Sequence, residues 1–126
     1  MRNLSLADII LLHEKVIAKT GGSQGIRDIN LIKSGIGRAF ATFDGKDLYK
    51  TIEAKIAVIT HSLISNHGFI DGNKRVGIVA MLLLLKLNGY RLCYSQQELI
   101  DLGLGIAAGK FNEHDIQVWI TGHRTI

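Results

Sequence analysis

The chain has 126 residues, 47% of them hydrophobic and 21% charged, and these proportions exclude a chain that is disordered throughout. Its one cysteine, Cys93, excludes an internal disulfide framework, so we expect a single domain over residues 1–126, located in the cytoplasm. The formal net charge of +4 permits an anionic partner, but the basic residues are spread along the chain, so we expect no direct binding of nucleic acid.

The N-terminal third of the chain predicts two helices with a loop between them. Ser5 is placed to cap the first helix, whose apolar residues recur at three- and four-residue steps until Gly21 ends the pattern. Residues 21–28, GGSQGIRD, are typical of a glycine-rich loop. A second helix is expected over residues 29–43, although two internal glycines weaken it.

Two long apolar helices are expected in the middle of the chain, over residues 48–66 and 73–88. The second is apolar on nearly every side, which is typical of a buried central helix. Its apolar run over 76–87 is shorter than the roughly 17–25 residues that cross a bilayer, and Lys86 interrupts it, so we expect no membrane partner.

Two shorter helices are expected in the C-terminal part of the chain. Ser95 and Glu98 have the spacing of a capping box, and Asn112 can cap the last helix. Residues 90–94 are expected to be extended. The predicted fold class is all-α, with about six helices packed in one domain around the buried central helix.

Residues 67–75, HGFIDGNKR, place polar and flexible residues between the two apolar helices. Asn73 can cap the following helix, whose free backbone N–H groups would attract an anion. Gly72 allows the backbone to approach a ligand closely. Lys74 and Arg75 oppose the helix dipole, which makes sense when a polyanion occupies the site. The pattern predicts that these four residues bind a phosphate.

Three further side chains of this segment have predicted roles. Asp71 would be repelled by a phosphate unless Mg²⁺ bridges the two, so it is the candidate metal ligand. His67 can take up a proton near neutral pH and is the candidate catalytic base. Phe69 is expected to anchor the loop to the core. The other histidines are expected to be packing or capping groups: His13, His61, His114 and His123.

The segment 67–75 resembles the signature of the Fic/Doc family, H-P-F-x-D/E-G-N-G-R-x-x-R, and its Asn-Lys-Arg is most similar to the Doc (death on curing) branch. The likeness extends to residues 21–28, to residues 29–38 and to the LNGYRL stretch after the central helix. It implies a Fic/Doc domain over the whole chain. It also implies a small β-hairpin flap at Asp44-Gly45, where the turn signal alone is equally typical of an ordinary loop.

The resemblance implies a role for each motif position. His67 would be the general base for a hydroxyl group of a target protein, and Asp71 would hold Mg²⁺ on the phosphates of the ATP substrate. The remaining positions would form the anion hole (Gly72 and Asn73), contact phosphate (Arg75) and pack into the core (Phe69). Gly68 stands where proline is usual, which implies a looser loop.

Two departures from the signature concern the reaction. Lys74 replaces the second glycine, and Ile78 stands where the last arginine would be, so both positions differ from adenylylating Fic proteins. The resemblance to Doc implies a toxin with protein kinase activity, which transfers the ATP γ-phosphate to a threonine of elongation factor Tu and arrests translation. Two alternatives stay open: a Fic-type adenylyltransferase, and a non-catalytic module that binds a nucleotide or nucleic acid.

Control of the activity is expected to come from a second chain. The four glutamates are followed by Lys, Ala, Leu and His, so the inhibitory motif of many Fic proteins is missing from the sequence. The resemblance implies an antitoxin of the Phd type, bound as a helix in a groove lined by the first helices.

Overall fold

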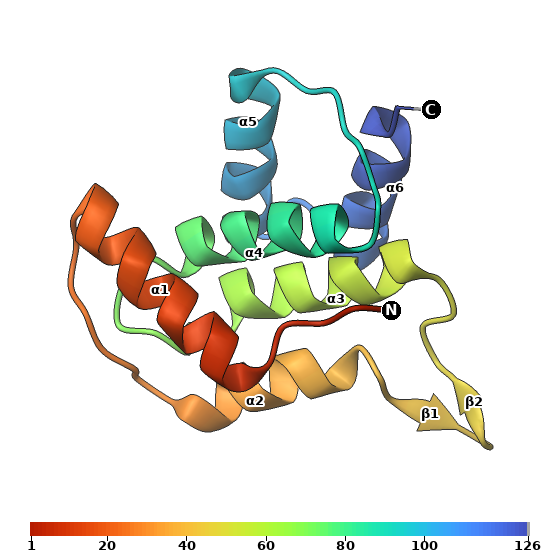
Figure 1. Cartoon of the computed structure of the whole chain (residues 1–126), viewed down its shortest axis with the longest axis horizontal. Helices are drawn as coiled ribbons and strands as arrows, with labels where there is room; N and C mark the ends of the chain where they lie inside the picture. Colours follow the sequence, from red (N-terminus) through yellow and green to blue (C-terminus); the bar gives the residue numbers. More distant parts are fainter. Residues whose placement is uncertain (126) are drawn as a thin grey trace.

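The computed structural model describes residues 1–125 and contains, over that range, six helices and one β-hairpin (Figure 1). In chain order the elements are α1 (Leu6–Thr20), α2 (Ile29–Arg38), β1 (Thr42–Phe43), β2 (Lys46–Asp47), α3 (Ile52–Ser65), α4 (Asn73–Leu87), α5 (Gln96–Ala107) and α6 (Glu113–His123). The prediction of an all-α fold with a small hairpin is confirmed.

Helices α3 and α4 lie side by side and antiparallel at the centre of the molecule (Figure 1). The inward face of α4 is fully enclosed, as predicted for the central helix, while Val79 and Lys86 on its other face are exposed. Helix α3 is buried over most of its length, because α2, α4, α5 and α6 all pack against it. The core is therefore organised around a pair of helices, and their connection forms a loop at one end of the pair.

Side-chain caps fix most of the helix ends, and the predicted ones are confirmed. Ser5 caps α1 and Ser95 caps α5, each in a capping box with an acidic residue three positions later. Asn112 caps α6 in the same way. Helix α3 begins after its own cap, Thr51, and not at residue 48 as predicted.

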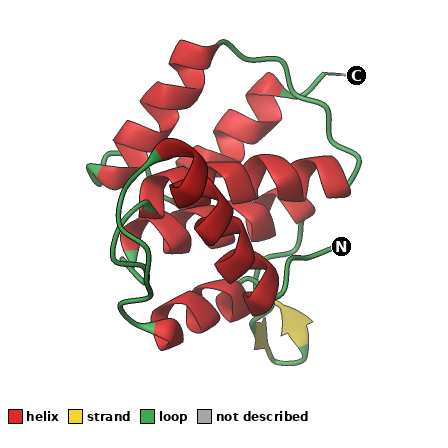
Figure 2. Ribbon diagram, turned by 60° about the vertical axis from the view of Figure 1, so that its left-hand side comes forward, coloured by secondary structure: helices red, strands yellow, loops and turns green. Residues whose placement is uncertain are grey.

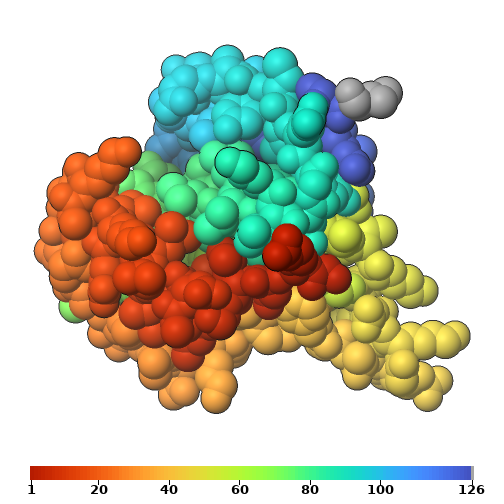
Figure 3. All heavy atoms as spheres, viewed as in Figure 1, coloured from red at the N-terminus to blue at the C-terminus, as the bar shows by residue number. Residues whose placement is uncertain are grey.

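The second helix is shorter than predicted, because the chain pairs with itself beyond Arg38. Thr42 pairs with Asp47 in an antiparallel hairpin, and Asp44 and Gly45 both have positive φ, of 53° and 75°. This is the backbone of a type I′ turn, which Asp-Gly favours. The hairpin projects from the body of the molecule (Figures 2 and 3). Of the two interpretations of the turn, the hairpin is the correct one.

The segment between α4 and α5 is extended at Leu92, which pairs with Arg124, and Cys93 N–H donates to the His123 carbonyl at 2.8 Å. The expected extended segment over 90–94 is therefore held against the end of α6. No helix within residues 1–125 has the length and apolar composition needed to cross a membrane.

Candidate active site

Two loops lie against each other at the end of the central helix pair: the motif loop, residues 67–72, and the glycine-rich loop, residues 21–28. Ile26 and Phe69 form an antiparallel bridge, and Ile70 N–H donates to the Gly25 carbonyl at 3.1 Å. The Gly68 carbonyl accepts from two successive N–H groups of the other loop, at 2.8 and 2.9 Å. The glycine-rich loop therefore fixes the backbone of the motif loop.

The Asn73 side chain closes the motif loop and does not cap α4. Its Oδ1 accepts from Phe69 N–H and its Nδ2 donates to the Phe69 carbonyl, both at 3.0 Å, and the residue is buried. The predicted N-cap is wrong: Gly72 holds that position, with φ of 76°, and makes no side-chain cap. A glycine supplies this left-handed backbone without strain, and it leaves the first-turn N–H groups of α4 free of a capping side chain.

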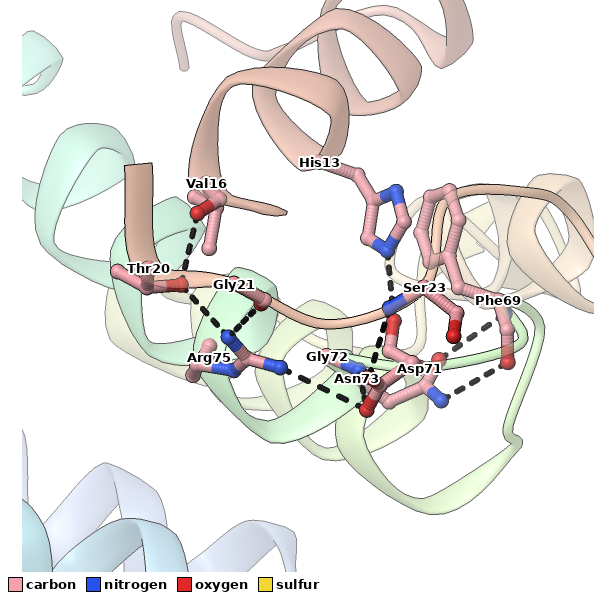
Figure 4. A network of polar contacts seen from close by, with 10 residues as sticks. All are labelled: His13, Val16, Thr20, Gly21, Ser23, Phe69, Asp71, Gly72, Asn73 and Arg75. Atoms are coloured by element: carbon pink, nitrogen blue, oxygen red, sulfur yellow. Dashed lines mark hydrogen bonds and ion pairs between the residues drawn. The ribbon is translucent and has the colours of Figure 1, made fainter. Parts of the chain in front are cut away.

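Asp71 lies beside this helix start with an ionised carboxylate (Figure 4). Oδ2 accepts from Ser23 N–H at 3.0 Å and Oδ1 from Gly72 N–H at 2.8 Å, and Arg75 lies 3.5 Å away. The two backbone N–H groups, Ser23 first, together with the Arg75 guanidinium, hold the pKa of the Asp71 carboxyl below its ordinary value.

The donor set at Asp71 fits Mg²⁺ held jointly by protein and phosphate. The side chain is 44% exposed, and each carboxylate oxygen accepts one backbone hydrogen bond, which leaves lone pairs for a cation. Within residues 1–125, no group of three or more His, Cys, Asp or Glu side chains could hold a metal ion. One carboxylate supplemented by phosphate oxygens is the usual way in which Mg²⁺ is bound at such sites.

Arg75 connects the start of α4 to the end of α1. Its Nη1 donates to Thr20 Oγ1 and to the Gly21 carbonyl, both at 2.6 Å (Figure 4). The Arg75 side chain is one-third exposed, and its guanidinium lies between these oxygens and Asp71. It is therefore held rigidly, with its charge beside the free N–H groups of the helix.

His67 lies in the motif loop and not at the end of α3, which finishes at Ser65 with Asn66 as C-cap. Its φ is 52°, in the left-handed region, and its side chain is exposed. Histidine is among the few non-glycine residues that adopt this region with some frequency. An exposed imidazole in this loop can reach a substrate from solution.

The chain is similar in sequence to proteins of one family. The model of the Fic/DOC family matches residues 3–85. Over 112 residues the chain is 30% identical to the protein kinase doc of Escherichia phage P1, covering 89% of this chain and 87% of that protein. It is 38% identical over 72 residues to the toxin Doc of Mycolicibacterium smegmatis, covering 57% of this chain and 55% of that protein.

The chain belongs to the Fic/Doc family. Both relatives carry the name Doc, so the predicted assignment to the Doc branch is also confirmed.

One residue of this Fic/Doc site, His13, was predicted only as a packing or capping group. It is buried in α1, stacks on the Phe69 ring at 3.8 Å between centroids, and its Nε2 lies 2.6 Å from the Asp71 carbonyl (Figure 4). A carbonyl only accepts, so Nε2 carries the proton. Phe69 itself is buried, so its ring lies in the core as expected of an anchor. The sequence did carry a sign of this contact, because His13 falls on the apolar face of the first predicted helix.

The expectation that Gly68 loosens the Fic/Doc motif loop is wrong. Gly68 is buried, and a Cβ added there would lie 2.4 Å from Ile32 Cγ1. The close approach of α2, together with the paired Gly68 carbonyl, leaves no space around this point of the loop.

Lys74, the Doc-like departure from the signature, is exposed at the rim of a groove between α1, α4 and α5. The groove has a volume of about 590 Å³. Its floor includes Ile78, Leu82 and Leu99, and Lys15 and Lys19 of α1 also lie along it. It is therefore an apolar groove with a basic rim that leads to the phosphate end of the candidate site.

Proposed function

We propose that this protein is a Doc-type toxin that transfers the γ-phosphate of ATP to a hydroxyl group of a target protein. The observation that carries the proposal is the uncapped start of α4, with Lys74 and Arg75 in its first turn and the exposed His67 in the loop before it. Phosphoryl transfer depends mainly on electrostatic stabilisation and positioning, which is what this arrangement supplies.

In the proposed reaction the free backbone N–H groups of the first turn of α4, from Asn73 onward, hold the phosphates, Gly72 lets them approach the backbone closely, and Arg75 and Lys74 balance their charge. His67 accepts the proton of the target hydroxyl, whose oxygen forms a bond to the γ-phosphorus while ADP leaves. Mg²⁺, when bound at Asp71, neutralises further phosphate charge. The buried Asn73 amide contributes by shaping the loop, so its part in phosphate binding comes from its main chain.

Kinase activity is favoured over AMP transfer by the two departures from the Fic signature. Lys74 adds a cation at the helix start, whereas a glycine there would leave the space open. Ile78, one turn further along α4, faces the apolar groove, so the arginine that seats the distal phosphates in adenylylating relatives is missing from that position. Seating ATP with its γ-phosphate toward His67 is consistent with both features.

The experiment that tests the reaction type is a transfer assay with two differently labelled nucleotides. Purified protein, Mg²⁺ and elongation factor Tu are incubated with ATP labelled at either the γ- or the α-phosphate. We expect only the γ label to reach protein, and His67→Ala to lower the rate of its transfer by about 10²- to 10⁴-fold. Transfer of the α label would establish AMP transfer. Toxicity that survives His67→Ala but not Lys74→Ala would establish a non-catalytic binding module.

The proposed target is a threonine of elongation factor Tu, so the proposed consequence is arrest of translation in the cytoplasm. Mass spectrometry of the labelled factor tests it: a single phosphothreonine is expected. A labelled residue other than threonine would contradict the assignment.

The proposed inhibitory partner is an antitoxin of the Phd type. The groove between α1, α4 and α5 has an apolar floor and a rim of lysines, so it fits an amphipathic helix with acidic residues along its polar edges. Binding there would cover Lys74 and hold α1 and α4 in place. Charge reversal at Lys19 is expected to weaken inhibition by the antitoxin.

A further inference from the structure

The glycine-rich loop presents one basic side chain, Arg27, to the backbone of the motif loop. Arg27 Nε donates to the His67 carbonyl at 2.6 Å, and Nη2 donates to the Asn66 carbonyl at 3.2 Å. Its own backbone N–H donates to the Gly68 carbonyl at 2.8 Å. Three consecutive carbonyl groups therefore accept hydrogen bonds from this single residue.

These carbonyls lie where α3 ends. A helix C-terminus carries a partial negative charge and unpaired carbonyl groups, which a nearby cation stabilises. The last turn of α3 contains no basic residue of its own. Arg27 supplies that cation from a segment about forty residues away in sequence, and its planar guanidinium can donate to two carbonyls at once.

His67 lies at the middle of this contact. The direction of its side chain matters, because His67 is the proposed base. Its left-handed φ of 52° is a conformation that neighbouring contacts must maintain. The backbone of His67 sets the direction in which Cβ projects, and with it the region that the exposed imidazole can reach. Releasing the His67 carbonyl would allow the peptide to rotate and would redirect the imidazole.

We propose that Arg27 is a positioning residue: by holding the carbonyls of residues 66–68 it fixes the left-handed backbone of His67 and so directs the imidazole toward the phosphate end of α4. The proposal rests on the proposed role of His67. Arg27 itself contacts the loop backbone upstream of the helix start, and so acts through His67 and not on the nucleotide.

The kinetic test compares Arg27→Ala and Arg27→Lys with a matched control, Lys110→Ala, which removes an exposed cation from the turn between α5 and α6. We expect Arg27→Ala to lower kcat for phosphate transfer by about tenfold to a hundredfold, with KM for ATP unchanged. Arg27→Lys should show most of this loss, because an ammonium group cannot reproduce the planar two-carbonyl contact. Lys110→Ala should match the wild type.

The same substitution in a His67→Ala background separates positioning from a direct role. With the base already removed, Arg27→Ala should cause no further loss of residual activity. A further loss of tenfold, or a large rise in KM for ATP, would mean that Arg27 binds substrate, and the proposal would be overturned.

A measurement without substrate keeps the test independent of the reaction. Backbone ¹⁵N order parameters at residues 66–68 should fall from about 0.85 toward 0.6 in Arg27→Ala and stay high in Lys110→Ala. Unchanged order parameters would refute the positioning role. If the wild type transferred no phosphate at all, the proposed function would fail, while this measurement would still decide what Arg27 does to the loop.

Discussion

At the scale of single residues, the motif loop is held by side chains that reach it from elsewhere in the chain. The Asn73 amide pairs with both polar groups of the Phe69 backbone, and His13 binds the Asp71 carbonyl from α1. Arg27 holds the carbonyl groups that precede them. Loss of any one of these side chains would leave a polar group of the loop backbone without its hydrogen-bond partner.

His13 supplies a hydrogen-bond donor to the motif loop. Removing that donor should destabilise the protein even when the core stays filled. His13→Phe keeps a ring against Phe69 but leaves the Asp71 carbonyl unpaired, at a cost of about 1–3 kcal/mol in the free energy of unfolding. His13→Ala also creates a cavity and should cost about 3–5 kcal/mol. Urea unfolding measures both, with the exposed His114→Ala as control. A His13→Phe protein as stable as the wild type would show that the hydrogen bond contributes nothing.

A side chain at Gly68 should be disfavoured because α2 leaves no room for it. The Cβ of Gly68→Ala would meet Ile32 Cγ1 at 2.4 Å, and overpacking of this kind costs about 1–3 kcal/mol. In an Ile32→Ala background the cost should largely disappear. Gly122→Ala is the matched control, since a Cβ at Gly122 meets open space and should stabilise α6 by up to about 1 kcal/mol. Equal effects at both glycines would contradict the packing explanation.

At the scale of elements, an ion pair between two side chains joins α5 to α6, and its strength depends on pH. His123 Nε2 lies 2.5 Å from Glu98 Oε2, and its Nδ1 lies 2.7 Å from the Trp119 carbonyl. Partial burial disfavours the charged imidazole, but these two acceptors outweigh it and raise the pKa of His123 above its ordinary value of 6.5. The bonds from His123 and from Ser95 lower the pKa of Glu98 below 4.5.

The link should therefore contribute most to stability at mildly acidic pH. A raised pKa at His123 gives stability that is complete below pH 6.5 and is lost as pH rises through the folded-state pKa. The lowered pKa of Glu98 gives stability that is present above pH 4.5 and is lost at lower pH. Glu98→Gln keeps the capping box and removes the charge. The difference in unfolding free energy between wild type and Glu98→Gln should be largest between pH 4.5 and 6.5, and a pH-independent difference would contradict this.

At the scale of the whole molecule, the candidate site is assembled by the central helix pair and closed from the N-terminal side. Helices α3 and α4 place the motif loop, and α1 with the glycine-rich loop covers it (Figure 1). The N-terminal segment is in turn tied to the far end of α4, since Arg2 and Asn88 exchange two hydrogen bonds of 2.8 Å. The site thus depends on contacts between residues far apart in sequence.

That dependence explains how much of the fold and of the candidate site could be predicted from the sequence. The helix starts after Ser5, Ser95 and Asn112 followed from local chemistry, because a capping box needs only its own first turn. The motif residues were likewise contiguous. The roles of His13 and Arg27 could not be predicted, since both act on carbonyl groups that only the fold brings near. Asn73 was misassigned for the same reason: its cap position was plausible locally, but the loop gives its amide a better partner in Phe69.

The central claim is that the start of α4 binds the phosphates of ATP. The most direct measurement is the titration of backbone amide signals with a non-hydrolysable ATP analogue and Mg²⁺. We expect the largest shifts at residues 72–75, with a response of the His67 imidazole, and the loss of these shifts in Asp71→Asn. Saturable binding with its largest shifts in another part of the chain, and none at residues 72–75, would contradict it.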